Sequence, residues 1–198
     1  MPNTATQSNV KNIMIVGVGG QGTLLASKLM GKAFVEKGFD VKVSEVHGMS
    51  QRGGSVVTYV RYGEKVYSPI VSEGTADVIL AFEQLEALRW VSFLSPEGTL
   101  IYNTQQINPM PVITGAAQYP EEIDAKLREV SPKILSVDAA KLALEAGNIK
   151  SVNVVLIGVL AATLTIPKED WVEALKKTVP PKFLELNLKA FELGYSLK

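Results

Sequence analysis

Apolar residues follow two different periods along this chain, and their order predicts an α/β fold. Short β-branched runs typical of buried strands recur through the sequence, at 13–16, 41–46, 55–62, 77–82, 99–103 and 134–137. Between and after them, apolar residues return every three or four positions, as in helices that bury one face. The predicted helices cover residues 23–36, 83–90, 121–130, 138–146, 152–165, 171–179 and 184–195.

Because strands and helices alternate, we predict a single-domain three-layer α/β/α sandwich with a mostly parallel sheet covered on both faces. One departure is expected. Tyr62-Gly63-Glu64-Lys65 predicts a tight turn into a short strand at Val66-Tyr67, and strands joined so closely must be antiparallel. Ser95–Gly98 predicts a turn, and 104–120 a surface excursion. We expect residues 1–10 to be a flexible tail and 11–198 to form the domain.

Glycine is concentrated where the first predicted strand meets the first predicted helix, with the spacing Gly17-x-Gly19-x-x-Gly22. Glycines permit a sharp turn and a close backbone approach, and N–H groups at a helix start can hold an anion such as phosphate. The sequence therefore predicts a cofactor- or phosphate-binding turn, formed by Gly17, Gly19, Gly20, Gln21 and Gly22. A turn that only packs the helix against the strand is the alternative.

The same spacing fits the dinucleotide fingerprint, with Glu45 near the place of its acidic ribose ligand. A stand-alone NAD-dependent dehydrogenase is therefore one candidate function, and a non-catalytic nucleotide-binding or sensor domain is another. The predicted antiparallel hairpin argues against the dehydrogenase, because a plain dinucleotide fold has a helix there.

An octapeptide, 47–54, follows the second predicted strand and carries more chemistry than a connection requires. Ligands of open α/β sheets bind at strand ends, and a guanidinium offers a planar fork of donors for a carboxylate or phosphate. We predict a partner or active-site loop made of Glu45, His47, Met49, Ser50, Gln51, Arg52, Gly53 and Gly54. His47 is a candidate proton-transfer group, with a partner contact or a plain loop histidine as the alternatives.

Composition limits what the chain can do. Its 20 basic and 20 acidic residues leave no net charge, which gives no sign of nucleic-acid binding. It has no cysteine and one histidine, so we expect neither a cysteine-ligated iron–sulfur cluster nor a histidine-rich metal site. The longest apolar run, 152–166, is shorter than the ~20 residues that span a bilayer. We expect no membrane association and a cytoplasmic location.

The glycine stretch and the octapeptide together resemble the γ-type subunits of the 2-oxoacid:ferredoxin oxidoreductases. Within that family, the form with His-Gly-Met-Ser is most similar to the β subunit of indolepyruvate:ferredoxin oxidoreductase. The similarity covers nearly the whole chain, including 77–83 and the apolar helix opened by Asn153. The resemblance implies the fold of domain III of pyruvate:ferredoxin oxidoreductase.

The resemblance also implies an enzyme of at least two chains that oxidatively decarboxylates aryl pyruvates. It uses coenzyme A as co-substrate, forms an acyl-CoA and carbon dioxide, and passes electrons to ferredoxin. In that family thiamine diphosphate, magnesium and the [4Fe–4S] clusters belong to a large α-type subunit. This chain lacks both cysteine and a Gly-Asp-Gly segment. We therefore expect no cofactor or metal in it, no catalysis by it alone, and the large subunit as its partner.

Overall fold

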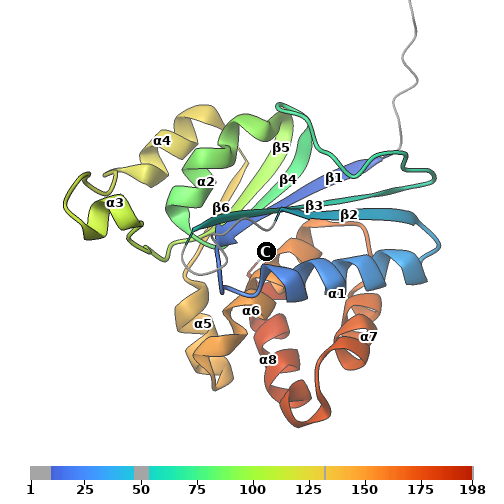
Figure 1. Cartoon of the computed structure of the whole chain (residues 1–198). Coiled ribbons are helices and arrows are strands. Elements are labelled where there is room, and N and C mark those ends of the chain that lie inside the picture. Colours follow the sequence, from blue (N-terminus) through green and yellow to red (C-terminus); the bar gives the residue numbers. More distant parts are fainter. Residues whose placement is uncertain (1–9, 47–53, 132, 198) are drawn as a thin grey trace, which may run out of the picture.

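The computed structural model describes residues 10–46, 54–131 and 133–197. Its centre is a six-stranded sheet in the order β2-β3-β1-β4-β5-β6 (Figure 1). The strands are β1 (Lys11–Val18), β2 (Asp40–Val46), β3 (Ser55–Gly63), β4 (Ala76–Ala81), β5 (Leu94–Asn103) and β6 (Ile134–Val137). β3 runs antiparallel to both of its neighbours, β1 and β2, whereas the pairs β1–β4, β4–β5 and β5–β6 are parallel.

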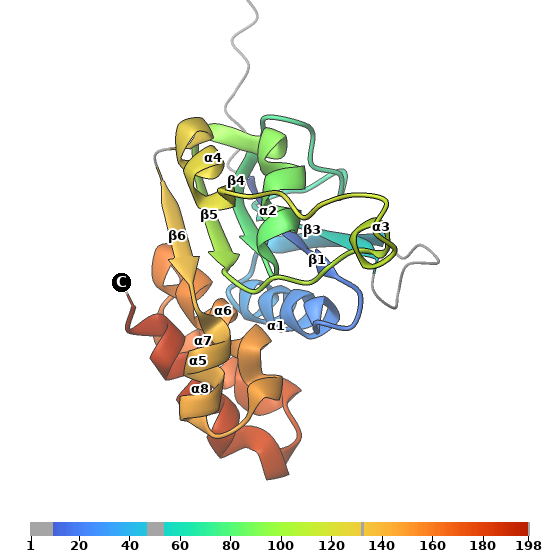
Figure 2. The ribbon, with the colours of Figure 1, turned by 90° about the vertical axis from the view of Figure 1, so that its left-hand side faces the viewer.

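Helices cover both faces of the sheet, as Figures 1 and 2 show. They are α1 (Thr23–Glu36), α2 (Gln84–Trp90), α3 (Met110–Ile113), α4 (Ile123–Val130), α5 (Ala139–Ala146), α6 (Val152–Thr163), α7 (Lys168–Thr178) and α8 (Leu184–Tyr195), with 3₁₀ turns η1 (Val91–Phe93), η2 (Ile149–Ser151) and η3 (Pro181–Phe183). α2 and α4 pack on one face, and α1 with α5–α8 on the other. The predicted three-layer α/β/α sandwich is confirmed.

The two cores follow from the alternation of side chains along β1. Ile13 and Ile15 point toward α1 and α6, whereas Met14 and Val16 point toward α2, and all four are fully buried. α6 lies in the middle of the larger helical layer and is buried nearly all round. It crosses α8 so closely that a Cβ on Gly194 would lie 2.0 Å from the Val155 carbonyl oxygen. Only glycine fits at such a backbone contact.

The sheet does contain an antiparallel strand, β3, but the partner strand predicted for it is wrong. No strand forms at Val66-Tyr67; β3 ends at Gly63 and pairs with β2 and β1 instead. The segment after β3 is held by side chains rather than by a ladder. Asp40 accepts from the Val66 N–H (2.9 Å), and the Arg61 guanidinium donates to the Ser68 carbonyl oxygen (2.7 Å).

The turn predicted at Ser95–Gly98 is also wrong, because these residues belong to an irregular stretch of β5. Between the pairs Ala76–Leu94 and Val78–Thr99, β4 advances two residues while β5 advances five. A Cβ on Gly98 would lie 2.7 Å from the Ala76 carbonyl oxygen, so glycine marks a close approach here and not a reversal. In the part of the chain that the structure describes, no helix is long and apolar enough to cross a membrane.

Candidate functional site

The carboxyl ends of β1 and β4 form the point where the chain changes direction across the sheet. α1 leaves β1 and leads toward β2 on one face, whereas α2 leaves β4 and leads toward β5 on the other. Open α/β sheets bind their ligands in the crevice outside such a switch point. The predicted glycine turn lies directly in this place.

Gln21 holds the glycine turn in shape from within. Its Oε1 accepts from the Val18 N–H (2.7 Å), and its Nε2 donates to the Phe82 carbonyl oxygen (3.0 Å). The side chain thereby joins the end of β1 to the end of β4. Gly20 and Gly22 have φ of 97° and 88°, a left-handed conformation that favours glycine. The Gln21 amide is therefore part of the frame of the turn, and its predicted contact with a cofactor stays a prediction.

Some backbone N–H groups of the turn are also used internally. The Gly19 N–H donates to the Gly54 carbonyl oxygen (2.9 Å), and the Gln21 N–H to the Val18 carbonyl oxygen (3.2 Å). Beyond them, Thr23 and Leu24 open α1, where helical N–H groups have no partner within the helix. These residues line a cleft of about 390 Å³ with Gly19, Gly20, Gly22, Val46, Val56 and Thr58. An anion-binding role of the turn remains a prediction.

Glu45 lies farther from the turn than the dinucleotide fingerprint requires. β3 is inserted between β1 and β2, so Glu45 stands opposite Thr58 rather than beside β1. Its Oε1 accepts from the Ser27 hydroxyl on α1 (2.7 Å). The acidic residue therefore braces α1 against the sheet, and the arrangement differs from a plain dinucleotide fold.

The predicted partner loop is described only at its two ends. Val46 stands opposite Val57 at the end of β2, and Gly54 is bound to the glycine turn through Gly19. The loop therefore starts and finishes at the switch point. His47, Met49, Ser50, Gln51, Arg52 and Gly53 lie outside the described residues, so their roles stay predictions.

Two buried carboxylates that the sequence analysis did not single out lie on the other side of the switch point. Glu83 follows β4 and caps α2, because its Oε2 accepts from the Glu86 N–H (2.9 Å). Its Oε1 accepts from the Ile107 N–H (3.1 Å) and from the Tyr119 hydroxyl. Glu83 thus holds both ends of the excursion that carries α3. Burial, followed by the hydrogen bond to Glu83 and its negative charge, raises the pKa of Tyr119.

Glu86 is only 2% exposed, yet two polar groups reach it. The Ser55 hydroxyl donates to one carboxylate oxygen and the Arg89 guanidinium to the other, each at 2.5 Å. The only available sequence signal was position: Glu83 ends a buried apolar run, and Glu86 lies one helical turn beyond it.

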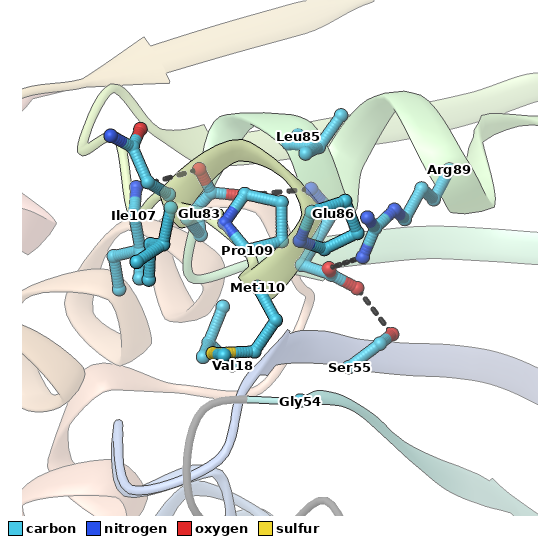
Figure 3. A pocket seen from close by; sticks show the side chains of 13 residues that line it. Val18, Gly54, Ser55, Glu83, Leu85, Glu86, Arg89, Ile107, Pro109 and Met110 are labelled. Atoms are coloured by element: carbon cyan, nitrogen blue, oxygen red, sulfur yellow. Dashed lines mark hydrogen bonds and ion pairs between the residues drawn. The ribbon is translucent and has the colours of Figure 1, made fainter. Parts of the chain in front are cut away.

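Together these residues border a second cleft, which we call the α2–α3 cleft, of about 590 Å³ (Figure 3). Its apolar wall includes Val18, Leu85, Met110 and Ile113, and its polar end consists of Ser55, Glu86 and Arg89. Across all described residues, no group of three histidine, cysteine, aspartate or glutamate side chains is placed to hold a metal ion.

Comparisons with known proteins agree on one family. Residues 12–197 match the sequence family described as pyruvate ferredoxin/flavodoxin oxidoreductase. The chain is 50% identical over 188 residues to "Indolepyruvate oxidoreductase subunit IorB" of Pyrococcus horikoshii, covering 92% of this chain and 93% of that one. The protein of the same name from Thermococcus kodakarensis is 49% identical, with the same coverage.

Solved structures share the fold. The keto/oxoacid ferredoxin oxidoreductase γ subunit of Geobacter sulfurreducens superposes with a TM-score of 0.69 and 25% identity, covering 94% of this chain and 96% of its own. A 2-oxoglutarate:ferredoxin oxidoreductase from Magnetococcus marinus superposes with a TM-score of 0.74 and 21% identity, covering 96% of this chain. There the match takes up 31% of that chain, so the same fold is one part of a longer polypeptide.

Proposed function

The chain belongs to the pyruvate ferredoxin/flavodoxin oxidoreductase family, and from this premise we propose that it is the γ-type subunit of an indolepyruvate-type 2-oxoacid:ferredoxin oxidoreductase. The complex would oxidatively decarboxylate an aryl pyruvate to an acyl-CoA and carbon dioxide, with electrons passing to ferredoxin. One observation carries the proposal. The identity to proteins named as indolepyruvate oxidoreductase subunits extends over 93% of their length, so the match is to a subunit as a whole.

The cofactors of this reaction are assigned to the larger partner subunit. Thiamine diphosphate supplies the carbanion-stabilising chemistry when it is bound there. Cysteine thiolates are the usual ligands of [4Fe–4S] clusters, and this chain has none. The residues of this chain therefore do not fit a cluster. Its contribution is to shape the active-site cleft and to hold the complex together.

In this proposal the switch-point edge of the sheet faces the large subunit. Gln21 and Glu83 hold the turns at that edge, and both described ends of the loop 47–53 are attached there. Two clefts open beside the glycine turn, one on each side of β1. Arg52 would pair with a carboxylate or phosphate across the junction, a role suited to a planar guanidinium. Coenzyme A would approach along the same edge.

The proposal is tested by purifying a tagged chain from its native host. We expect a partner several times larger with iron–sulfur absorption, and reduction of a low-potential dye by indolepyruvate and coenzyme A only when both chains are present. Robust turnover by the isolated chain would contradict the proposal. So would specific binding of NAD with a dissociation constant of ~10 μM or tighter, about −7 kcal/mol.

A further inference from the structure

The α2–α3 cleft has the features of a ligand site and has no role in the proposed function so far. Its volume of about 590 Å³ lies within the roughly 300–1,000 Å³ of small-molecule pockets. Such pockets combine apolar walls with a few convergent polar groups. Figure 3 shows Met110 near Val18, the group Arg89, Glu86 and Ser55 to one side of them, and Glu83 near Ile107 on the other.

The group at the polar end of the cleft that can still bind a ligand is the guanidinium of Arg89, which suits an anion. Glu86 already accepts from Ser55 and Arg89, and Glu83 accepts from two N–H groups and one hydroxyl. Both carboxylates are therefore satisfied inside the protein. Within the described residues, Arg89 makes no other hydrogen bond than the one to Glu86, and its side chain is 42% exposed. Glu86 thus fixes the guanidinium while leaving its remaining donors to a carboxylate.

The apolar end of the cleft favours a flat, ring-sized body. Met110 and Ile113 border the cavity and are 64% and 65% exposed, so their apolar side chains are open to contact with a ligand. A methionine side chain is pliable and makes favourable contacts with aromatic rings. Pro109 and Pro111 flank Met110 and restrict the backbone of this wall. The wall is held at both ends by Glu83, through Ile107 and Tyr119.

We propose that the α2–α3 cleft binds a small arylalkyl carboxylate, with the carboxylate on Arg89 and the ring against Met110, Ile113 and Leu85. Aryl 2-oxoacids belong to this chemical class. The link between this site and the 2-oxoacid reaction therefore rests on the proposed function. The binding itself is tested on the full chain alone. Its failure would leave the subunit assignment intact, and a failure of that assignment would not remove the binding.

Trp90 provides a local reporter. Its indole N–H donates to the Ser55 hydroxyl (3.4 Å) at the polar end of the cleft. The second tryptophan, Trp171, is fully buried in the opposite helical layer against Phe34. The two indole N–H signals in a ¹⁵N-correlated NMR spectrum therefore separate binding in the cleft from a general effect on the fold.

The experiment titrates the labelled full chain with 3-phenylpropionate and with uncharged 3-phenylpropionamide. We expect the Trp90 signal to shift saturably with the carboxylate, with a dissociation constant on the order of 1 mM or tighter, while the Trp171 signal stays unchanged. The amide should bind at least about tenfold more weakly, because it loses the charge-assisted bond. Equal binding of the two compounds, or a shift that does not saturate, would overturn the proposal without any variant being made.

Variants assign the contacts. Arg89→Gln should weaken 3-phenylpropionate binding by about tenfold or more, and Arg89→Lys should restore only part of it. Arg128→Gln is the matched control, because Arg128 also pairs with a carboxylate within its own helix, Asp124 (2.7 Å), but lies on α4 outside the cleft. Met110→Gln should weaken 3-phenylpropionate binding and leave unchanged the weaker binding of acetate, a probe that has the carboxylate but no ring. An unaltered affinity in Arg89→Gln would contradict the assignment.

Discussion

The two ends of the parallel strands are held by different interactions. At the amino ends, ion pairs open to solvent link neighbouring strands, such as Lys11 with the half-buried Asp77 (3.0 Å) and Lys133, just before β6, with Glu97 (2.7 Å). At the carboxyl ends, buried or half-buried side chains such as Gln21 and Glu83 receive and donate hydrogen bonds inside the protein. Exposed pairs contribute little to stability, whereas a buried donor left unpaired is costly. The difference indicates that the carboxyl-end edge of the sheet keeps a fixed shape.

The largest effect on this comparison is expected from Glu83→Ala. Three donors would lose their acceptor: the Glu86 N–H, the Ile107 N–H and the Tyr119 hydroxyl. An unpaired buried group costs roughly 1–3 kcal/mol. Because Ile107 and Tyr119 are only half-buried, their groups lie at the low end of that range, and the free energy of unfolding should fall by about 3–5 kcal/mol. Urea denaturation measures the change, with the exposed Glu121→Ala as control. Equal stability of the two variants would show that Glu83 does not anchor the α3 excursion.

Arg52→Ala should separate binding from stability. If Arg52 pairs with an anion at the subunit junction, its loss should weaken the affinity for the large subunit by about 2–5 kcal/mol. The isolated chain should change by no more than about 0.5 kcal/mol, as is usual for loop surface positions. Arg52→Lys should rescue binding only partly. A large drop in the melting temperature of the free chain would instead show that Arg52 stabilises the subunit through contacts within it.

Gly22→Ala and Gly20→Ala form a matched pair at the glycine turn. Both residues have positive φ, which costs a non-glycine residue roughly 1–2 kcal/mol. A Cβ at Gly22 would also lie 2.6 Å from Asn153 Nδ2, whereas a Cβ at Gly20 meets nothing within 4 Å. Gly22→Ala should therefore destabilise the chain by about 1–3 kcal/mol and Gly20→Ala by less. The reverse order in thermal denaturation would exclude the Asn153 contact as the reason for glycine at position 22.

The smallest effect is expected at the amino-end edge, from Lys133→Ala. Lys133 lowers the pKa of Glu97, through a hydrogen bond and its positive charge. A carboxyl group with a lowered folded-state pKa stabilises the fold above its unfolded pKa, and this contribution is lost as the pH falls through the folded value. Because the pair is exposed, the variant should match the parent within the error of a denaturation curve at pH 7. It should also lose slightly less stability on acidification, and a clear loss at pH 7 would contradict the comparison.

The sequence was sufficient for the six strands of the sheet and for every described α-helix except α3, because period and glycine position are local signals. Asp138 caps α5 by accepting from the Lys141 N–H (3.0 Å), and Gly147 follows its last residue, which agrees with the predicted helix over 138–146. The pairing of β3 was not recoverable in the same way. Tertiary packing determines that β3 pairs with β2 and β1. Val66-Tyr67 was predicted as its partner because it lies nearer in sequence.

The candidate site was predicted on one side only. The glycine turn has a distinctive spacing, but Glu83 and Glu86 look like ordinary helix-start acids until the fold buries them beside Ser55 and the α3 excursion. Those contacts join segments 24 to 36 positions apart in sequence, and no short pattern encodes them. Arg89 was not predicted for the same reason, because its position is fixed only by its pairing with the buried Glu86.

The central claim is that the carboxyl-end edge of the sheet faces a large subunit. Amide hydrogen exchange of the chain, alone and in complex, tests it most directly. We predict added protection at 17–25, 54–55 and 105–113, which meet at the switch point, and in the predicted partner loop 47–53. We predict no change at 64–75 or 95–98 around the amino ends. Protection confined to the amino-end segments, or to α7 and α8, would contradict the claim.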